Sequence, residues 1–209
     1  IYTGIAVVIL VGLVILGGIK SIAKVCNSLV PFMALFYIVG CVFILVQGYE
    51  TLWNTITLIG KSAFTGQAAV GGFAGSTIMM AARYGVARGL FSNESGLGSA
   101  PIVAAQAQTR NPVRQALVSS SGTFWDTVVV CALTGLVLVN TGVWSTGLKG
   151  IQLTKMAFEN IPYVGGFFLT IGLVTFTFST IIGWSYYAEK SVEYLWGNKA
   201  INYYRIVYL

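Results

Sequence analysis

The sequence predicts an all-α membrane protein, and three observations lead to this fold class. Hydrophobic residues make up 56% of the 209 residues and charged residues only 9%, far below the roughly 25% of an ordinary soluble domain. Each of five uncharged runs is long enough for a helix to cross a hydrocarbon core about 30 Å thick; they cover 1–19, 25–49, 62–82, 127–148 and 160–188. These runs leave no length for a soluble domain. We therefore expect five or six membrane spans.

The helical elements follow from these runs and from the residues between them. They are expected in this order: a helix over 1–17 that ends at Gly17-Gly18, a basic turn, a helix over 31–48 with Pro31 near its start, an interfacial segment over 50–67, a long helix over 113–140, an amphipathic loop over 144–162, and a crossing helix over 163–188. Both ends of the sequence lie inside apolar runs. The chain is therefore expected to be a piece of a larger protein.

The basic residues indicate topology rather than nucleic-acid binding. The net charge is +6, but the twelve basic residues are scattered between hydrophobic runs and form no basic face. If successive loops alternate sides, seven basic residues share one side, namely Lys20, Lys24, Arg110, Arg114, Lys190, Lys199 and Arg205. Three share the other side, namely Lys61, Lys149 and Lys155. The positive-inside rule then predicts that the first side is cytoplasmic.

Most enzyme chemistries lack the residues that they need. The chain has no histidine, which excludes Ser-His and Cys-His nucleophile pairs and imidazole metal sites. Its three cysteines, Cys26, Cys41 and Cys131, have no ligand spacing and are expected to pack as small hydrophobic residues. We predict that the chain is not an enzyme and holds no cofactor. A transporter, a channel and a structural membrane subunit remain.

One polar stretch interrupts the apolar sequence at residues 91–99, which read FSNESGLGS. Irregular backbone at membrane depth is tolerated only where protein buries it or where it lines a water-filled cavity. Gly96 and Gly98 can leave helical dihedral angles, so a broken helix is predicted, with one half ending near Phe91 and the other beginning near Gly98. The opposed helix ends would suit a zwitterion or a cation. The alternative is a loop outside the membrane, followed by an interfacial helix over 99–109.

Three longer segments resemble a known family. They read GGFAGSTIMMAARYGVARGLFSNESGLGSAP, NPVRQALV followed by DTVVVCALTG, and FSTIIGWSYYAEKSVEYLWG. They are similar to the alanine or glycine:cation symporter family, the sodium:alanine symporters, over most of the chain. The resemblance implies part of a leucine-transporter-like bundle, in which two inverted repeats each hold substrate at a broken first helix. Residues 1–48 would end the first repeat, and 68–209 would form most of the second.

The resemblance also implies a substrate site. Phe91 and Ser92 would offer backbone carbonyls to the ammonium group of an amino acid, and Asn93 would hydrogen-bond the substrate. Thr180 and Trp184 are four residues apart and so share a helix face. A hydroxyl beside an indole wall would suit a side chain as small as that of alanine or glycine. From the residues alone, Asn93 could equally cap a helix end, and Trp184 could pack in the core or anchor at the interface.

A cation site is implied on the same helix. Ser179, Thr180 and the carbonyl of Phe176 present hard oxygen atoms, and the family resemblance places a sodium ion there. On their own, the two hydroxyls could instead bond to the preceding turn of their helix, which is their commoner use in membrane helices. Two further carboxylates within membrane range, Glu94 and Asp126, are left without a role.

The predicted function is sodium-coupled symport of alanine or glycine by alternating access. The protein is expected to be a multi-pass protein of the plasma membrane, in a bacterial inner membrane, with the lipid bilayer, the substrate and sodium as its partners. The family protein is about twice as long, so a missing N-terminal part of the same protein is expected to complete the site. Coupling to protons stays open. A channel or a structural subunit is the rival, although polarity here is concentrated at one break and one facing helix.

Overall fold

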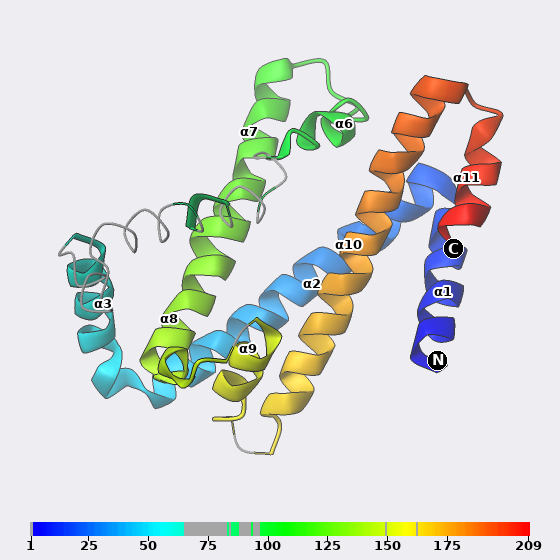
Figure 1. Ribbon diagram of the computed structural model, residues 1–209. Helices are drawn as coiled ribbons and strands as arrows, with labels where there is room; N and C mark the ends of the chain where they lie inside the picture. Colours follow the sequence, from blue (N-terminus) through cyan, green and yellow to red (C-terminus); the bar gives the residue numbers. More distant parts are fainter. Residues whose placement is uncertain are drawn as a thin grey trace. The chain divides into compact units, whose positions relative to one another are not determined.

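The computed structural model describes residues 2–64, 83, 85–87, 93, 97–148, 150–161 and 163–209. All regular elements in these ranges are helices, which confirms the predicted all-α class (Figure 1). The chain divides into two compact units. The first unit joins residues Ile1–Tyr37 to Phe167–Leu209, and the second comprises Ile38–Gly166.

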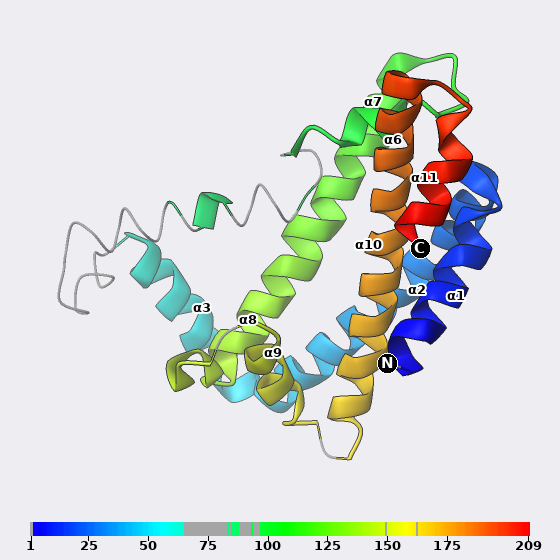
Figure 2. The ribbon, with the colours of Figure 1, turned by 45° about the vertical axis from the view of Figure 1, so that its right-hand side comes forward.

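The first unit contains the N-terminal helices and the C-terminal helices of the chain. Its elements are α1 (Tyr2–Ile15), the first part of α2 (Gly18–Gln47), most of α10 (Gly165–Trp196) and α11 (Ala200–Tyr208). Aromatic rings pack α2 against α10: Phe36 and Phe168 stack with their centroids 4.4 Å apart, and Tyr37 meets Phe176 edge-on at 5.7 Å. The helices α1 and α11 lie side by side in both ribbon views (Figures 1 and 2).

The start of α2 differs from the prediction. The sequence suggested a basic turn and then a helix beginning near Pro31, whereas α2 begins at Gly18 and contains Pro31 in its interior. Lys20 and Lys24 therefore lie on the helix. Gly18 separates α1 from α2 because its φ of +68° is in the left-handed region that glycine adopts without a steric penalty. Proline in a helix removes one backbone donor, which membrane helices tolerate where neighbouring groups compensate.

The second unit contains the remaining elements in sequence order. They are the end of α2, α3 (Tyr49–Phe64), α6 (Ala100–Ala104), α7 (Pro112–Thr123), the π-helical segment η2 (Phe124–Cys131), α8 (Ala132–Asn140), the 3₁₀ turn η3 (Val143–Thr146) and α9 (Ile151–Phe158). The elements α7, η2 and α8 form one continuous helix (Figure 1). Its predicted span, 113–140, is correct to within one residue.

A strong local signal fixes the start of this long helix. The side-chain oxygen of Asn111 accepts hydrogen bonds from the backbone N–H groups of Val113 at 2.9 Å and Arg114 at 3.3 Å. Pro112 occupies the first helical position, where its missing N–H costs little. An asparagine cap followed by proline therefore begins the helix at the residue where the sequence suggests it.

Three helices of the described residues are long and apolar enough to cross a membrane: Gly18–Gln47, Pro112–Asn140 and Gly165–Trp196. The helix α1 is apolar but has only 14 residues. The predicted span over 62–82 lies almost wholly outside the described residues. At most 28% of the apolar window of any of the three long helices is buried. Their outward faces are thus left to contact lipid or further protein.

Candidate functional site

The predicted break in the second unit is described only in part. Phe91, Ser92 and Glu94 lie outside the described residues. Gly98 has a φ of +79°, a left-handed conformation that interrupts a helix, and α6 begins at Ala100, directly after it. The chain therefore leaves helical geometry at Gly98 and resumes it two residues later, near the position predicted for the second half helix.

Asn93 is half-buried and contacts the long helix of the second unit. The hydroxyl of Thr123 lies 3.3 Å from the Asn93 side-chain oxygen and donates a hydrogen bond to it. Thr123 is the last residue of α7, and the backbone widens into the π-helical segment η2 directly after it. Such π-helical segments frequently occur at functional sites. The sequence analysis did not single out Thr123, although the polar run SSSGT before Phe124 is an unusual composition for a membrane helix.

Asp126 lies in the same π-helical segment and is half-buried. The sequence analysis left it without a role. It lies three residues beyond Thr123, the last residue of α7 and the one that contacts Asn93. Asn93, Thr123 and Asp126 contribute an amide, a hydroxyl and a carboxylate to the described part of the second unit.

The predicted cation residues lie together on α10, in the first unit. The hydroxyls of Ser179 and Thr180 both donate to the Phe176 carbonyl oxygen, each at 2.9 Å. The Ser179 hydroxyl also lies 3.6 Å from the sulfur of Met33 on α2. This is the within-helix bonding that the residues alone suggested as an alternative. A hydroxyl that donates its proton still carries acceptor lone pairs, so three oxygen atoms are gathered within one helical turn.

Thr180 and Trp184 share an exposed face of α10. Trp184 is 45% exposed, so it is not a core residue of this unit. Its indole meets the ring of Tyr187 edge-on, with centroids 5.7 Å apart and planes at 87°. Tyr187 was not predicted as part of the site, because only a ring contact identifies it. The indole thus packs against Tyr187 and stays partly exposed.

The predicted substrate residues thus divide between the two units. Asn93 belongs to the second unit, and Thr180 and Trp184 belong to the first. The structure describes each group within its own unit. A joint substrate site formed by all three remains a prediction.

A second polar cluster, missed by the sequence analysis, lies at the C-terminal end of α10. Arg205 on α11 forms a bidentate ion pair with Glu189 on α10, with nitrogen–oxygen distances of 2.7 and 3.0 Å. The Glu189 side chain is only 7% exposed and that of Arg205 17%. The hydrogen bond that Arg205 donates to Glu189 raises the pKa of Arg205 above its usual value.

This cluster also reaches α1. The remaining guanidinium nitrogen of Arg205, Nη1, lies 3.5 Å from the carbonyl oxygen of Leu16, which directly follows the last residue of α1. Two tyrosines of α11 bond to backbone carbonyls of α10: Tyr204 to Ser185 at 3.0 Å and Tyr208 to Ile181 at 2.9 Å. The cluster therefore joins three helices of the first unit. Arg205 meets the chain at Leu16, four positions before Lys20 in the sequence, and the charge pattern predicts that both basic residues lie on the same side of the membrane.

The comparison with known families decides what kind of protein carries these features. The sequence model of the sodium:alanine symporter family matches residues 1–209, the whole of this chain. The chain belongs to the sodium:alanine symporter family. This membership confirms the resemblance inferred from the sequence motifs.

Individual members of the symporter family are similar over nearly the whole chain. A Haemophilus influenzae protein described as an uncharacterized transporter is 50% identical over 99% of this chain and 46% of its own length. The sodium/alanine symporter AgcS of Methanococcus maripaludis is 49% identical over 99% of this chain and 46% of its length. The probable sodium/glutamine symporter GlnT of Bacillus subtilis is 37% identical over 97% and 42%. The chain spans a little under half the length of these curated relatives.

Membership of the symporter family also settles the class of protein. The family and these relatives are transporters, which agrees with the prediction that the chain is not an enzyme. The apolar helices of membrane-spanning length fit a membrane transporter.

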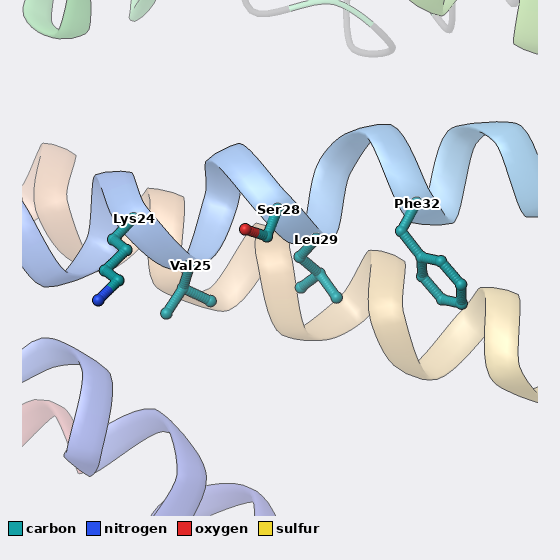
Figure 3. Close-up of a pocket in the computed structure, with 5 residues that line it drawn as sticks. All are labelled: Lys24, Val25, Ser28, Leu29 and Phe32. Carbon is teal, nitrogen blue, oxygen red and sulfur yellow. The ribbon is translucent and has the colours of Figure 1, made fainter.

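The symporter chain also has a shallow surface groove on α2. Five side chains of one face of α2 line it: Lys24, Val25, Ser28, Leu29 and Phe32 (Figure 3). Lys24, Ser28 and Phe32 are four residues apart, as are Val25 and Leu29, so the five side chains lie along one stripe of the helix. None of the predicted substrate or cation residues lines this groove.

Proposed function

We propose that the complete protein is a secondary active transporter that carries a small amino acid, alanine or glycine, together with sodium by alternating access. The observation that carries this proposal is the family match over the whole chain, supported by relatives whose names include sodium/alanine symporter. We further propose the leucine-transporter-like arrangement, with residues 1–48 ending the first repeat and 68–209 forming most of the second. An N-terminal part of the same protein would complete the bundle in the plasma membrane.

The oxygen cluster on α10 is the proposed sodium site. Sodium is a small hard cation that prefers uncharged and charged oxygen ligands, and α10 gathers a carbonyl and two hydroxyl oxygens at Phe176, Ser179 and Thr180. Both hydroxyls donate their protons to the carbonyl. A bound ion would compete for that carbonyl, so the hydroxyls would have to give up or share their bonds to it. Further ligands would come from the N-terminal part.

Two groups of residues are proposed to contact the amino-acid substrate. Asn93, with the carbonyls of Phe91 and Ser92, would bind the charged backbone groups of the substrate at the helix break. Thr180 and Trp184 would line the space for its side chain. The exposure of the indole and the four-residue spacing from Thr180 support this role. The relative named as a glutamine symporter suggests that this space varies in size among family members.

Counterflow in proteoliposomes tests the proposed function. Full-length protein would be reconstituted and loaded with unlabelled alanine, and the entry of labelled alanine would be followed with sodium and with choline in its place. We expect accumulation that needs both internal alanine and sodium. Accumulation driven equally well by a proton gradient without sodium would replace the coupling ion, and alanine conductance without exchange would indicate a channel.

A further inference from the structure

The end of α8 carries an asparagine that bonds to the elbow between α2 and α3. The side-chain oxygen of Asn140 accepts hydrogen bonds from the hydroxyls of Thr51 at 2.8 Å and Thr55 at 2.9 Å. Its side-chain nitrogen donates to the carbonyl oxygen of Gly48 at 3.2 Å. All of these residues belong to the second unit. One amide thus holds three points of the elbow, and we call Gly48, Thr51, Thr55 and Asn140 the elbow clasp.

Asn140 also explains why the elbow residue is a glycine. Gly48 is not one of the described glycines with a positive φ, so its backbone conformation is open to other residues. A Cβ atom at this position, however, would collide with the side-chain nitrogen of Asn140. The next nearest atoms, the Asn140 Cγ and the Ile44 carbonyl oxygen, would lie at the ordinary contact distances of 3.5 and 3.7 Å. Gly48 and Asn140, 92 positions apart, therefore depend on each other.

The hydrogen-bonding groups of the elbow clasp have partners at a place where unpaired polar groups would be costly. Thr55 is 6% exposed, and Asn140 ends the apolar helix ALTGLVLVN. The amide oxygen has both of its acceptor positions filled by hydroxyl donors. Loss of the amide would leave the buried Thr55 hydroxyl without this acceptor, and such a loss costs more than the net value of one hydrogen bond.

The position of the clasp in the chain links it to the proposed substrate site. The helix α3 leads directly into residues 65–97, which contain the predicted break and Asn93. The helix that ends at Asn140 is the continuous one whose Thr123 bonds to Asn93. The clasp therefore joins α3, which precedes residues 65–97, to the long helix that carries Thr123.

We infer that Asn140 is a positioning residue for transport: by holding the elbow at Gly48, it fixes the direction in which α3 leads toward residues 65–97. This inference rests on the proposed function. Asn140 is not among the predicted substrate or sodium residues. Its loss should consequently lower the rate at which the two flanking helices move together, and should leave the substrate contacts themselves in place.

Uptake kinetics of the full-length protein test this role. We expect Asn140→Ala to lower the maximal rate of alanine uptake at least about tenfold, equivalent to about 1.4 kcal/mol, with KM changed less than about twofold. Thr55→Ala should lower the maximal rate in the same way. Thr55→Ser should keep the wild-type rate, because serine retains the hydroxyl. The matched control is Thr141→Ala, since the Thr141 hydroxyl bonds to its own helix at Val137. An unchanged maximal rate in Asn140→Ala, or a rise in KM as large as the fall in the maximal rate, overturns the positioning role.

A double-mutant cycle on thermal stability tests the clasp without transport. Gly48→Ala should lower the apparent melting temperature in the wild-type background because its methyl group meets the Asn140 amide. In the Asn140→Ala background the same change should cost nothing or stabilise slightly, since alanine is the better helix former. Additive effects would overturn the clasp. If the cycle shows this coupling but the wild-type protein does not transport alanine, the proposed function is refuted and the clasp is still established.

Discussion

Replacing Arg205 with alanine is expected to destabilise the protein by about 3–5 kcal/mol, because the substitution leaves a buried carboxylate without its partner. The Glu189 side chain is 7% exposed and accepts two hydrogen bonds from the guanidinium, at 2.7 and 3.0 Å. Arg205→Ala also removes the contact between α11 and the carbonyl end of α1. The loss should therefore exceed that of a surface ion pair by several-fold.

Thermal unfolding of the full-length protein in detergent, at one fixed scan rate, measures this effect. The matched control is Lys155→Ala, which breaks a pair with Glu159 that is 3.9 Å long and has both side chains more than half exposed. That change should cost at most about 0.5 kcal/mol. Adding Glu189→Gln to Arg205→Ala should recover most of the melting temperature, because the uncompensated charge is then gone. Equal effects of Arg205→Ala and Lys155→Ala would refute the reasoning.

Two further substitutions test the proposed substrate contacts. Asn93→Ala should weaken alanine binding by about 1.5–3 kcal/mol at normal expression, as expected for a hydrogen bond to a charged group; unchanged affinity in the full-length protein would remove Asn93 from the site. Trp184→Ala should enlarge the side-chain space and permit uptake of valine or leucine. A uniform loss of uptake with no change of selectivity would instead indicate that the indole packs against an unseen part of the protein.

The sequence predicted the elements that local rules control. The long helix begins at Pro112, in its first position behind the Asn111 cap, one residue before the predicted start of 113–140. The start of α2 was predicted wrongly because the same preference of proline for the first helical turn was applied to Pro31, which lies in the helix interior. A local preference cannot report the compensating contacts of a neighbouring helix.

Contacts between residues far apart in the chain could not be predicted from the sequence. The bonds of Ser179 and Thr180 to Phe176 were anticipated as an alternative, because residues three and four apart meet within one helix. The Glu189–Arg205 pair joins two helices, and the Gly48–Asn140 pair joins residues 92 positions apart. Nothing in the spacing of these residues identifies their partners. Only the packing of the helices does.

Sodium dependence of uptake tests the central claim, that α10 holds the coupling ion beside a small amino acid. The double substitution Ser179→Ala and Thr180→Ala removes two of the three gathered oxygens, and Thr175→Ala serves as its control because that hydroxyl bonds to Ile171 and Gly172 one turn earlier. We predict that the double variant needs a much higher sodium concentration for half-maximal alanine uptake, whereas Thr175→Ala resembles the wild type. A double variant with unaltered sodium dependence would contradict the account and place the cation site elsewhere.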